Sequence, residues 1–202
     1  MTLPLYLASQ SPRRLQLLAQ IGVEPSLLLP GDEEDPEALE AVTPGELPAN
    51  YVQRVTAAKL RAAVARHRRR GLAPGAILCA DTTVALGRRI LGKPADAAEA
   101  AATLALLSGR THRVLTAVAL QLGRRHWRSL QVSRVSFAVL PPAVIRAYVA
   151  SGDPFGKAGS YAIQGALAAW VAHIDGSHSG IMGLPLFETA QLLRRAGVET
   201  SL

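Results

Sequence analysis

Residues 3–21 read LPLYLASQSPRRLQLLAQI, in which an apolar stretch is followed by a polar turn and an amphipathic segment. The apolar residues 3–8 predict a short buried strand. Ser11 and Pro12 predict the start of a helix, because serine suits the N-cap position and proline suits the first helical position. The apolar positions of this helix are Leu15, Leu17, Leu18 and Ile21. The chain therefore opens with a strand, a turn and a helix.

Strands and helices alternate along the rest of the chain. The predicted strands are 26–29, 76–81, 83–86, 90–91, 114–122, 130–140 and 170–174, with a hairpin turn at 87–89. The predicted helices are 49–69, 96–107, 142–150 and 185–195. This alternation favours an α/β fold in which helices flank a mixed, twisted sheet. The length of 202 residues suits a single domain over residues 1–202, with two lobes around a central cleft.

The composition predicts a soluble, cytoplasmic protein. Apolar residues make up 49% of the chain, which is enough for a core without disulfides or structural metals. The single cysteine, Cys79, lies in an apolar stretch and is interpreted as a small buried hydrophobic residue. The first residues lack the features of a signal peptide, and no window approaches the ~18 apolar residues of a membrane span. We therefore expect no association with a membrane.

The net charge of +7 comes almost wholly from arginine, since only three of the 22 basic residues are lysines. A lysine ammonium binds phosphate as a compact point charge, which makes Lys59, Lys93 and Lys157 informative. Lys59 lies on the inward face of the helix predicted at 49–69. The densest basic run, residues 66–70, ends that helix, where cations offset the helix dipole. Aromatic residues do not interleave with basic ones, so we expect no stable complex with nucleic acid.

Two familiar motifs are excluded. Residues 87–94, GRRILGKP, match the G-x-x-x-x-G-K pattern of a phosphate loop. Pro94 stands where that loop needs a Ser or Thr hydroxyl for Mg²⁺, so this is not a phosphate loop. The histidines show no zinc-ligand spacing, and Cys79 has no partner for a zinc site.

Charged residues at strand ends and helix starts form the remaining candidate site. Residues 9–14 combine hydroxyls, helix N-terminal amides and two arginines, which suits either an anion site or an ordinary capped helix. Asp81, followed by Thr82, closes a predicted buried strand, and functional groups of open α/β sheets gather at such ends. Glu33 and Glu34 lie in an acidic loop that is either solvated or part of a metal–triphosphate site. The second reading requires that these acids meet the three lysines in one cleft.

Five segments of the chain resemble the Maf family, in the family's order. They are LYLASQSPRRLQLLAQIGV, CADTTVALGRRILGKP, LSGRTHRVLTAVAL, KAGSYAIQG and GSHSGIMGLPLFET. The resemblance implies a mixed-sheet α/β fold similar to that of inosine-triphosphate pyrophosphatases. It also implies an enzyme that uses a divalent metal, Mg²⁺ or Mn²⁺. Such an enzyme hydrolyses nucleoside triphosphates to monophosphate and pyrophosphate by water attack on the α-phosphorus. A homodimer is a further expectation from the family.

The resemblance also implies roles for individual residues. Asp81 corresponds to the catalytic proton acceptor and to a metal ligand. Glu34, together with Glu33, corresponds to the acidic group that holds metal or water. The implied phosphate-binding residues are Ser9, Ser11, Arg13, Arg14, Lys59, Lys93 and Lys157. Many family members read D-K-A-G-x-Y, whereas Gly156 precedes Lys157 here, so this chain does without that aspartate.

Base choice is the last implication of the resemblance. Arg13, Thr82 and Gln164 match the residues that mark the family's dTTP- and UTP-hydrolysing members. A glutamine amide presents a donor and an acceptor together, which suits a pyrimidine edge. Two alternatives stay open. One is a pyrophosphatase for 7-methyl-GTP or another noncanonical nucleotide. The other is a regulatory or nucleic-acid-binding protein, because the family is linked by name to septum formation.

Overall fold

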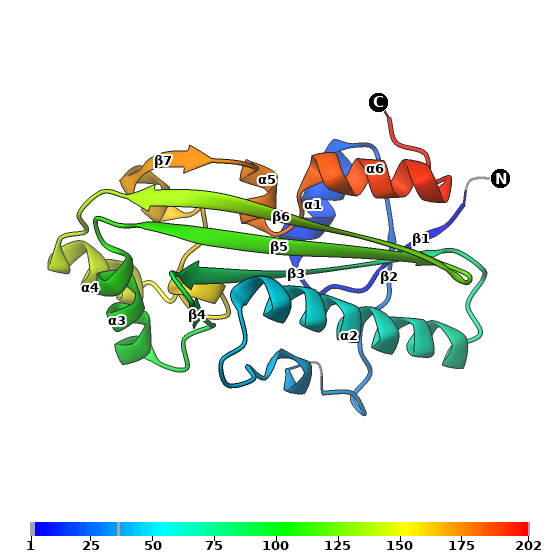
Figure 1. The fold of residues 1–202 in the computed structure, drawn as a ribbon, viewed down its shortest axis with the longest axis horizontal. Coiled ribbons are helices and arrows are strands. Elements are labelled where there is room, and N and C mark those ends of the chain that lie inside the picture. The colour runs from blue at the N-terminus through cyan, green and yellow to red at the C-terminus, as the bar shows by residue number, and fades with distance from the viewer. Residues whose placement is uncertain (1–2, 36, 202) are drawn as a thin grey trace.

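The computed structural model describes residues 3–35 and 37–201, and within them one mixed sheet has seven strands. The strands are β1 (Leu5–Leu7), β2 (Ser26–Leu27), β3 (Ala76–Leu86), β4 (Arg89–Leu91), β5 (Thr111–Leu122), β6 (Arg125–Phe137) and β7 (Val171–Asp175). Their order is β2-β1-β3-β5-β6-β7, and β4 also pairs with β3. β1 is parallel to β2 and β3, whereas the other pairs are antiparallel. The mixed α/β architecture expected from the sequence is confirmed (Figure 1).

The helices begin and end close to their predicted positions. The α-helices are α1 (Pro12–Gln20), α2 (Pro48–Arg69), α3 (Ala97–Leu107), α4 (Pro142–Ala150), α5 (His178–Met182) and α6 (Leu186–Ala196). Three 3₁₀ helices are η1 (Ala38–Glu40), η2 (Ala158–Ser160) and η3 (Ala166–Trp170). Helix α5 and the three 3₁₀ helices differ from the predicted elements, because elements of one or two turns are too short to show a helical period in the sequence.

Helix α2 covers one face of the sheet along β3 and β5 (Figure 1). Its positions Val52, Val55 and Ala63 are fully buried, as the apolar stripe predicted. On the same face of β3, Ile77 and Cys79 pack under the helix. Burial of Cys79 raises the pKa of its thiol to about 12, which confirms its role as a buried hydrophobic residue.

Two apolar clusters lie at opposite ends of the long strands. One joins α1 and α6 to the first half of β3, through residues such as Leu17, Leu78 and Leu193. The other joins α3 and α4 to the second half of β3, through residues such as Val84 and Leu104. Figure 1 shows α1 and α6 together near the two termini, with α3 and α4 at the far end of the sheet. This division produces the two predicted lobes.

The prediction that a strand ends at Asp81 was wrong, because β3 runs without interruption from Ala76 to Leu86. Its pairing with β5 continues through Asp81, which lies opposite Ala117. What changes along β3 is the neighbour on its other edge. β1 pairs with residues 76–78, and β4 pairs with residues 84–86. In the described ranges no strand pairs with residues 79–83 on that edge, so the sheet has an opening beside Asp81.

The long antiparallel strands also differ from their predicted ranges. β5 begins at Thr111 and β6 at Arg125, earlier than expected, and β6 ends at Phe137. The two strands pair over their whole length around Gly123, so cross-strand hydrogen bonding extends them through polar residues.

None of the helices that the structure describes has both the length and the apolar character of a membrane span.

Candidate functional site

A cavity of about 1060 Å³ opens beside the unpaired edge of β3, between the two lobes. This volume suits a small-molecule ligand. Eleven of the residues predicted for the site line the cavity. They are Ser9, Ser11, Arg13, Arg14, Glu34, Lys59, Asp81, Thr82, Lys93, Lys157 and Gln164. Segments that are distant in the sequence therefore converge on one cleft, whereas Glu33, which was also predicted for the site, is not among the lining residues.

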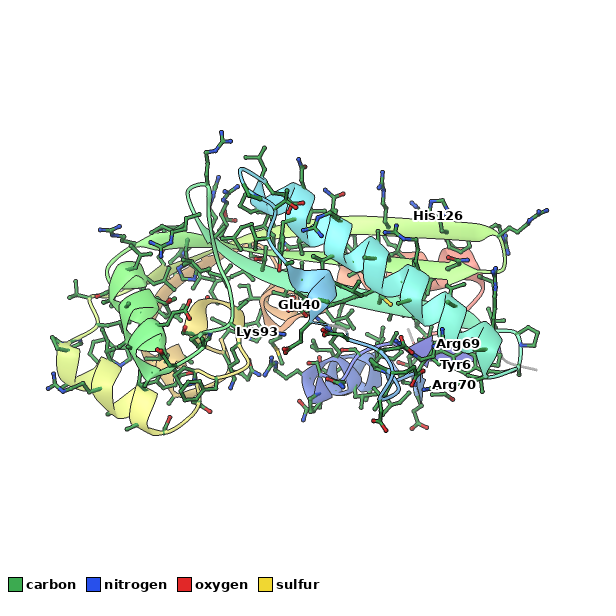
Figure 2. All side chains as sticks on the ribbon, turned by 90° about the horizontal axis from the view of Figure 1, so that it is seen from below. Tyr6, Glu40, Arg69, Arg70, Lys93 and His126 are labelled. Carbon is green, nitrogen blue, oxygen red and sulfur yellow. The ribbon has the colours of Figure 1, made fainter. Side chains whose placement is uncertain are left out.

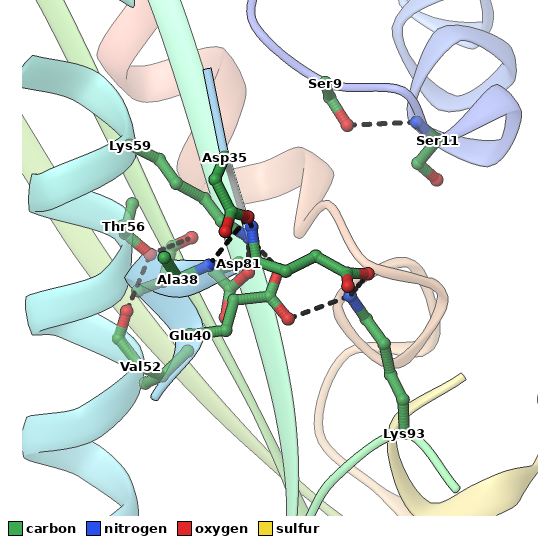
Figure 3. Close-up of polar contacts among 12 residues, drawn as sticks. Ser9, Ser11, Asp35, Ala38, Glu40, Val52, Thr56, Lys59, Asp81 and Lys93 are labelled. Carbon is green, nitrogen blue, oxygen red and sulfur yellow. Dashed lines mark hydrogen bonds and ion pairs between the residues drawn. The ribbon is translucent and has the colours of Figure 1, made fainter. Parts of the chain in front are cut away.

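Two acids and two lysines that line the cavity form an alternating row, whose contacts are shown in Figure 3. The ammonium of Lys59 lies 2.5 Å from an Asp81 carboxylate oxygen and 2.6 Å from Glu40 Oε1. The other oxygen of Glu40 lies 2.8 Å from the ammonium of Lys93. Lys59 comes from α2, Asp81 from β3, Glu40 from η1 and Lys93 from the segment after β4.

Burial controls the charge state of this row. Asp81 is only 7% exposed, and burial raises the pKa of its carboxyl even though Lys59 and Arg14 oppose that change. Burial also disfavours the charged form of Lys59, but Asp81 and Glu40 outweigh it and raise the pKa of the ammonium. Asp81 therefore combines a buried setting, which raises its pKa and favours a proton-accepting role, with neighbouring cations that favour the carboxylate form.

Glu40 is the residue of this row that the sequence analysis missed. It ends η1, and the hydroxyl of Tyr51 on α2 donates a 2.9 Å hydrogen bond to its backbone carbonyl. Asp35 accepts hydrogen bonds from the amides of Glu37 and Ala38, which fixes the start of the same turn. Figure 2 shows Glu40 beside Lys93, well away from Arg69 and Arg70 at the end of α2.

Glu34 has a different setting from the one predicted. Arg66 donates two hydrogen bonds to its carboxylate, at 2.8 and 2.6 Å, and Arg69 donates a third at 2.9 Å. The hydrogen bonds from Arg66 lower the pKa of Glu34 to about 2. Glu33 is exposed and lies 3.4 Å from Arg69. Glu40 is therefore the acid that shares Lys59 with Asp81. Glu33 and Glu34 instead pair with arginines.

Arg66 is also an exception to the expected solvated end of α2. Its side chain is buried, and besides Glu34 it binds the carbonyl of Leu28 at 2.8 Å. The positions Val52, Val55, Lys59, Ala63 and Arg66 follow the helical period, so the inward stripe extends one turn further than predicted.

The turn between β1 and α1 forms another wall of the cavity. Ser9 Oγ accepts a 3.2 Å hydrogen bond from the amide of Ser11 and a 2.9 Å bond from Arg14. Arg14 also donates to the carbonyl of Gly183 at 2.8 Å, so Ser9 and Arg14 fix the shape of the turn. Helix α1 begins at Pro12 as predicted, but the hydroxyl of Ser11 makes no capping bond. Within residues 3–35 and 37–201 no side chain pairs with Arg13, whose charge remains available to an anion.

The chain matches a known family over most of its length. The family model described as Maf-like protein matches residues 4–196. The chain belongs to the Maf family. A dTTP/UTP pyrophosphatase of a Polaromonas species is 63% identical over 194 residues, which cover 96% of each chain. A second protein of that name, from Albidiferax ferrireducens, is 60% identical over 193 residues and 96% of each chain.

Among solved structures, a distant similarity was found to a crystal structure from Mycobacterium abscessus. That protein is named a nucleoside-triphosphatase and dITP/XTP pyrophosphatase. The sequence identity is 21%, the TM-score is 0.43, and the match covers 68% of this chain and 76% of the other.

The Maf segment KAGSYAIQG forms the remaining wall of the cavity. The ammonium of Lys157 donates a hydrogen bond to the backbone carbonyl of Asp153. Gly156, which precedes Lys157, has a φ of +70°. Gln164 is exposed at the cavity, and within the described ranges its amide has no hydrogen-bond partner. The amide is therefore free to bind a ligand.

Thr82 lies on the face of β3 opposite to Asp81. Its hydroxyl oxygen is 2.9 Å from that of Thr116, which in turn donates to the carbonyl of Gly180 at 2.7 Å. Each hydroxyl has one proton, so Thr82 must donate to Thr116. The lone pairs of Thr82 then remain available as acceptors toward the cavity.

No group of three or more His, Cys, Asp or Glu side chains in the described ranges is arranged to hold a metal ion.

Proposed function

We propose that this Maf protein hydrolyses dTTP and UTP to the nucleoside monophosphate and pyrophosphate. The observation that carries the proposal is the convergence of Asp81, Lys59 and Lys93 with Glu40 in one cavity. The two relatives named above bear the name of this activity, and each covers nearly the whole chain.

The lysines and Arg13 are proposed to bind the triphosphate. Glu40 accepts one hydrogen bond from Lys59 and forms an ion pair with Lys93. Its carboxylate therefore lies between two ammonium groups, in a position that suits an anionic phosphate. Arg13 adds a third cation without a described partner. Charged hydrogen bonds between such groups and phosphate oxygens are strong, which favours a trianionic or tetra-anionic ligand.

A divalent metal, Mg²⁺ or Mn²⁺, fits the donor set of the row. Asp81 and Glu40 both contact the ammonium of Lys59, so two carboxylates already surround one positively charged group. Mg²⁺ is usually bound by one or two carboxylates together with waters and substrate phosphates, which agrees with the lack of a larger acidic group in the described ranges. When bound, the metal would neutralise phosphate charge and lower the pKa of a bound water. We propose Asp81 and Glu40 as its ligands, in place of Asp81 and Glu34.

The chemical step is proposed to start at Asp81. Its carboxylate accepts a proton from a water molecule, whose oxygen attacks the α-phosphorus. The bond from the α-phosphorus to the bridging oxygen breaks, and pyrophosphate leaves beside Lys59, Lys93 and Arg13. These cations stabilise the negative charge that develops on the leaving group. The other product is the nucleoside monophosphate.

Base choice is assigned to Gln164, with Thr82 and Arg13. The unpartnered amide of Gln164 offers a donor and an acceptor, which matches the carbonyl and N–H groups on the edge of thymine or uracil. Thr82 supplies acceptor lone pairs on the same cavity.

A panel of nucleoside triphosphates tests the proposal. The purified protein is incubated with dTTP, UTP, CTP, GTP or 7-methyl-GTP and with Mg²⁺ or Mn²⁺, and the products are separated by chromatography. We expect dTMP or UMP with pyrophosphate, and the highest rates with dTTP and UTP. Nucleoside diphosphate and phosphate as products would contradict the proposal. A clear preference for 7-methyl-GTP would favour the other Maf specificity, and salt-dependent DNA binding without turnover would favour the regulatory alternative.

A further inference from the structure

Phe155 is an exposed aromatic residue that the proposed chemistry does not use. It is 41% exposed and lines the cavity that contains Asp81. Of the other phenylalanines, Phe137 is buried in the apolar core, and Phe187 is 73% exposed on α6 outside the cavity lining. An aromatic ring left partly exposed at a ligand cavity gains free energy when a flat apolar surface covers it.

The turn that carries Phe155 is well defined. The amide of Phe155 donates to the carbonyl of Gly152 at 3.3 Å. Gly152 and Gly156 on either side have φ values of +81° and +70°, which a side chain would disfavour. Lys157 closes the turn by donating to the carbonyl of Asp153. The phenylalanine is thus presented on a turn whose backbone is held at both ends.

This turn contacts the segment that carries Gln164. A Cβ atom added to Gly165 would lie 3.3 Å from the Asp153 carboxylate and 3.3 Å from the carbonyl of Ala162. Asp153 is two residues before Phe155, and Gly165 directly follows Gln164. The exposed ring and the unpartnered amide therefore belong to two neighbouring segments that both line the cavity.

We propose that Phe155 stacks on the face of the nucleobase whose edge is bound by Gln164. This inference rests on the proposed function, since it names the residue that holds the base of the same substrate. The two contacts have different consequences. Stacking on an aromatic ring tolerates any base, because every base has a π-face, so Phe155 supplies affinity. Hydrogen bonding depends on the base edge, so Gln164 supplies selectivity.

The test compares three substitutions at Phe155 with a matched control. Phe155→Ala removes the ring, Phe155→Tyr and Phe155→Trp retain one, and Phe187→Ala removes the other exposed phenylalanine. Two probes are titrated by calorimetry: dTMP, which has a base, and pyrophosphate, which has none. Steady-state kinetics with dTTP are measured on the same proteins.

We expect Phe155→Ala to weaken dTMP binding roughly tenfold or more, with pyrophosphate binding within about twofold of the wild type. The KM for dTTP should rise more than kcat falls. Phe155→Tyr and Phe155→Trp should restore dTMP binding, and Phe187→Ala should leave both probes unchanged. In Phe155→Trp, dTMP should also quench the added indole fluorescence, and pyrophosphate should not.

Any of three results would overturn the stacking role. One is dTMP binding that is unchanged in Phe155→Ala, and another is an equal loss for dTMP and pyrophosphate. The third is a lack of dTMP binding by the wild type. A failure of the proposed function would give a different result. The wild-type protein would then release no pyrophosphate from dTTP, even if dTMP bound through Phe155.

Discussion

Lys59 and Asp81 form a 2.5 Å ion pair between the inward face of α2 and the middle of β3. Both side chains are largely buried, with 18% and 10% of their side-chain surface exposed. A buried pair of this kind contributes little net stability, because desolvation offsets the attraction of the charges. Its position at the opening in the sheet edge, next to Glu40 and Lys93, is better explained by substrate binding and proton transfer.

Substitution of the proposed base tests its role directly. Asp81→Asn keeps the size of the side chain but removes the proton acceptor, so kcat for dTTP should fall about 10²–10⁴-fold. The far-ultraviolet circular dichroism spectrum should not change. Asp175→Asn, on the exposed strand β7, is the control and should keep full activity. Near-normal turnover by Asp81→Asn would exclude the residue as the base.

A pair of glutamine substitutions distinguishes the two candidate metal ligands. Glu40→Gln should raise the metal concentration needed for half-maximal activity at least tenfold, because it removes one of the two proposed carboxylate ligands. Glu34→Gln should leave that concentration unchanged. It should instead lower the free energy of unfolding by roughly 1–3 kcal/mol, because buried Arg66 loses its anionic partner. The opposite pattern, in which only Glu34→Gln changes the metal requirement, would assign the metal to Glu34.

Gln164 is expected to control base selection more than phosphate binding. In Gln164→Ala the kcat/KM ratio of UTP to GTP should fall roughly tenfold, since the lost hydrogen bonds depend on the base edge. Inhibition by pyrophosphate should stay the same, because Arg13 and the lysines are intact. An unchanged ratio of UTP to GTP would rule out this role.

A buried histidine predicts a pH dependence of stability. His112 Nε2 lies 2.7 Å from the hydroxyl of Tyr161, and burial lowers the pKa of the imidazole to about 4. The unfolded chain binds a proton near pH 6.5, whereas the folded protein resists it until about pH 4. Stability from this group is therefore complete above pH 6.5 and is lost as the pH falls toward 4.

Urea unfolding at pH 7.5 and 4.5 measures this effect. The wild type should lose about 2–3 kcal/mol more between these values than His112→Gln, which does not titrate. Equal losses in the two proteins would show that His112 does not cause the difference.

The sequence predicted which residues line the cavity better than it predicted how they are arranged there. The helical period placed Lys59 on the inward face of α2, and the same period, continued one turn, would have shown Arg66 to be inward as well. Asp81 was selected as a strand end, although it lies within β3. The relevant feature is the gap between the neighbours β1 and β4, which no local pattern of β3 encodes.

Glu40 could not be distinguished in advance from the other acids of its loop. The segment from Asp32 to Glu46 contains several carboxylates without a period, and which of them faces the cavity depends on the turn η1 and on Tyr51. The pairing of Glu34 with Arg66 likewise joins residues 32 positions apart. Such contacts are set by tertiary packing of the loop on α2.

The position of water attack is the most direct test of the proposed reaction. dTTP is hydrolysed by the wild-type protein in water enriched in ¹⁸O, and the products are analysed by mass spectrometry. Attack on the α-phosphorus beside Asp81 predicts one ¹⁸O atom in dTMP and none in pyrophosphate. Label in pyrophosphate, or labelled phosphate released with dTDP, would contradict it.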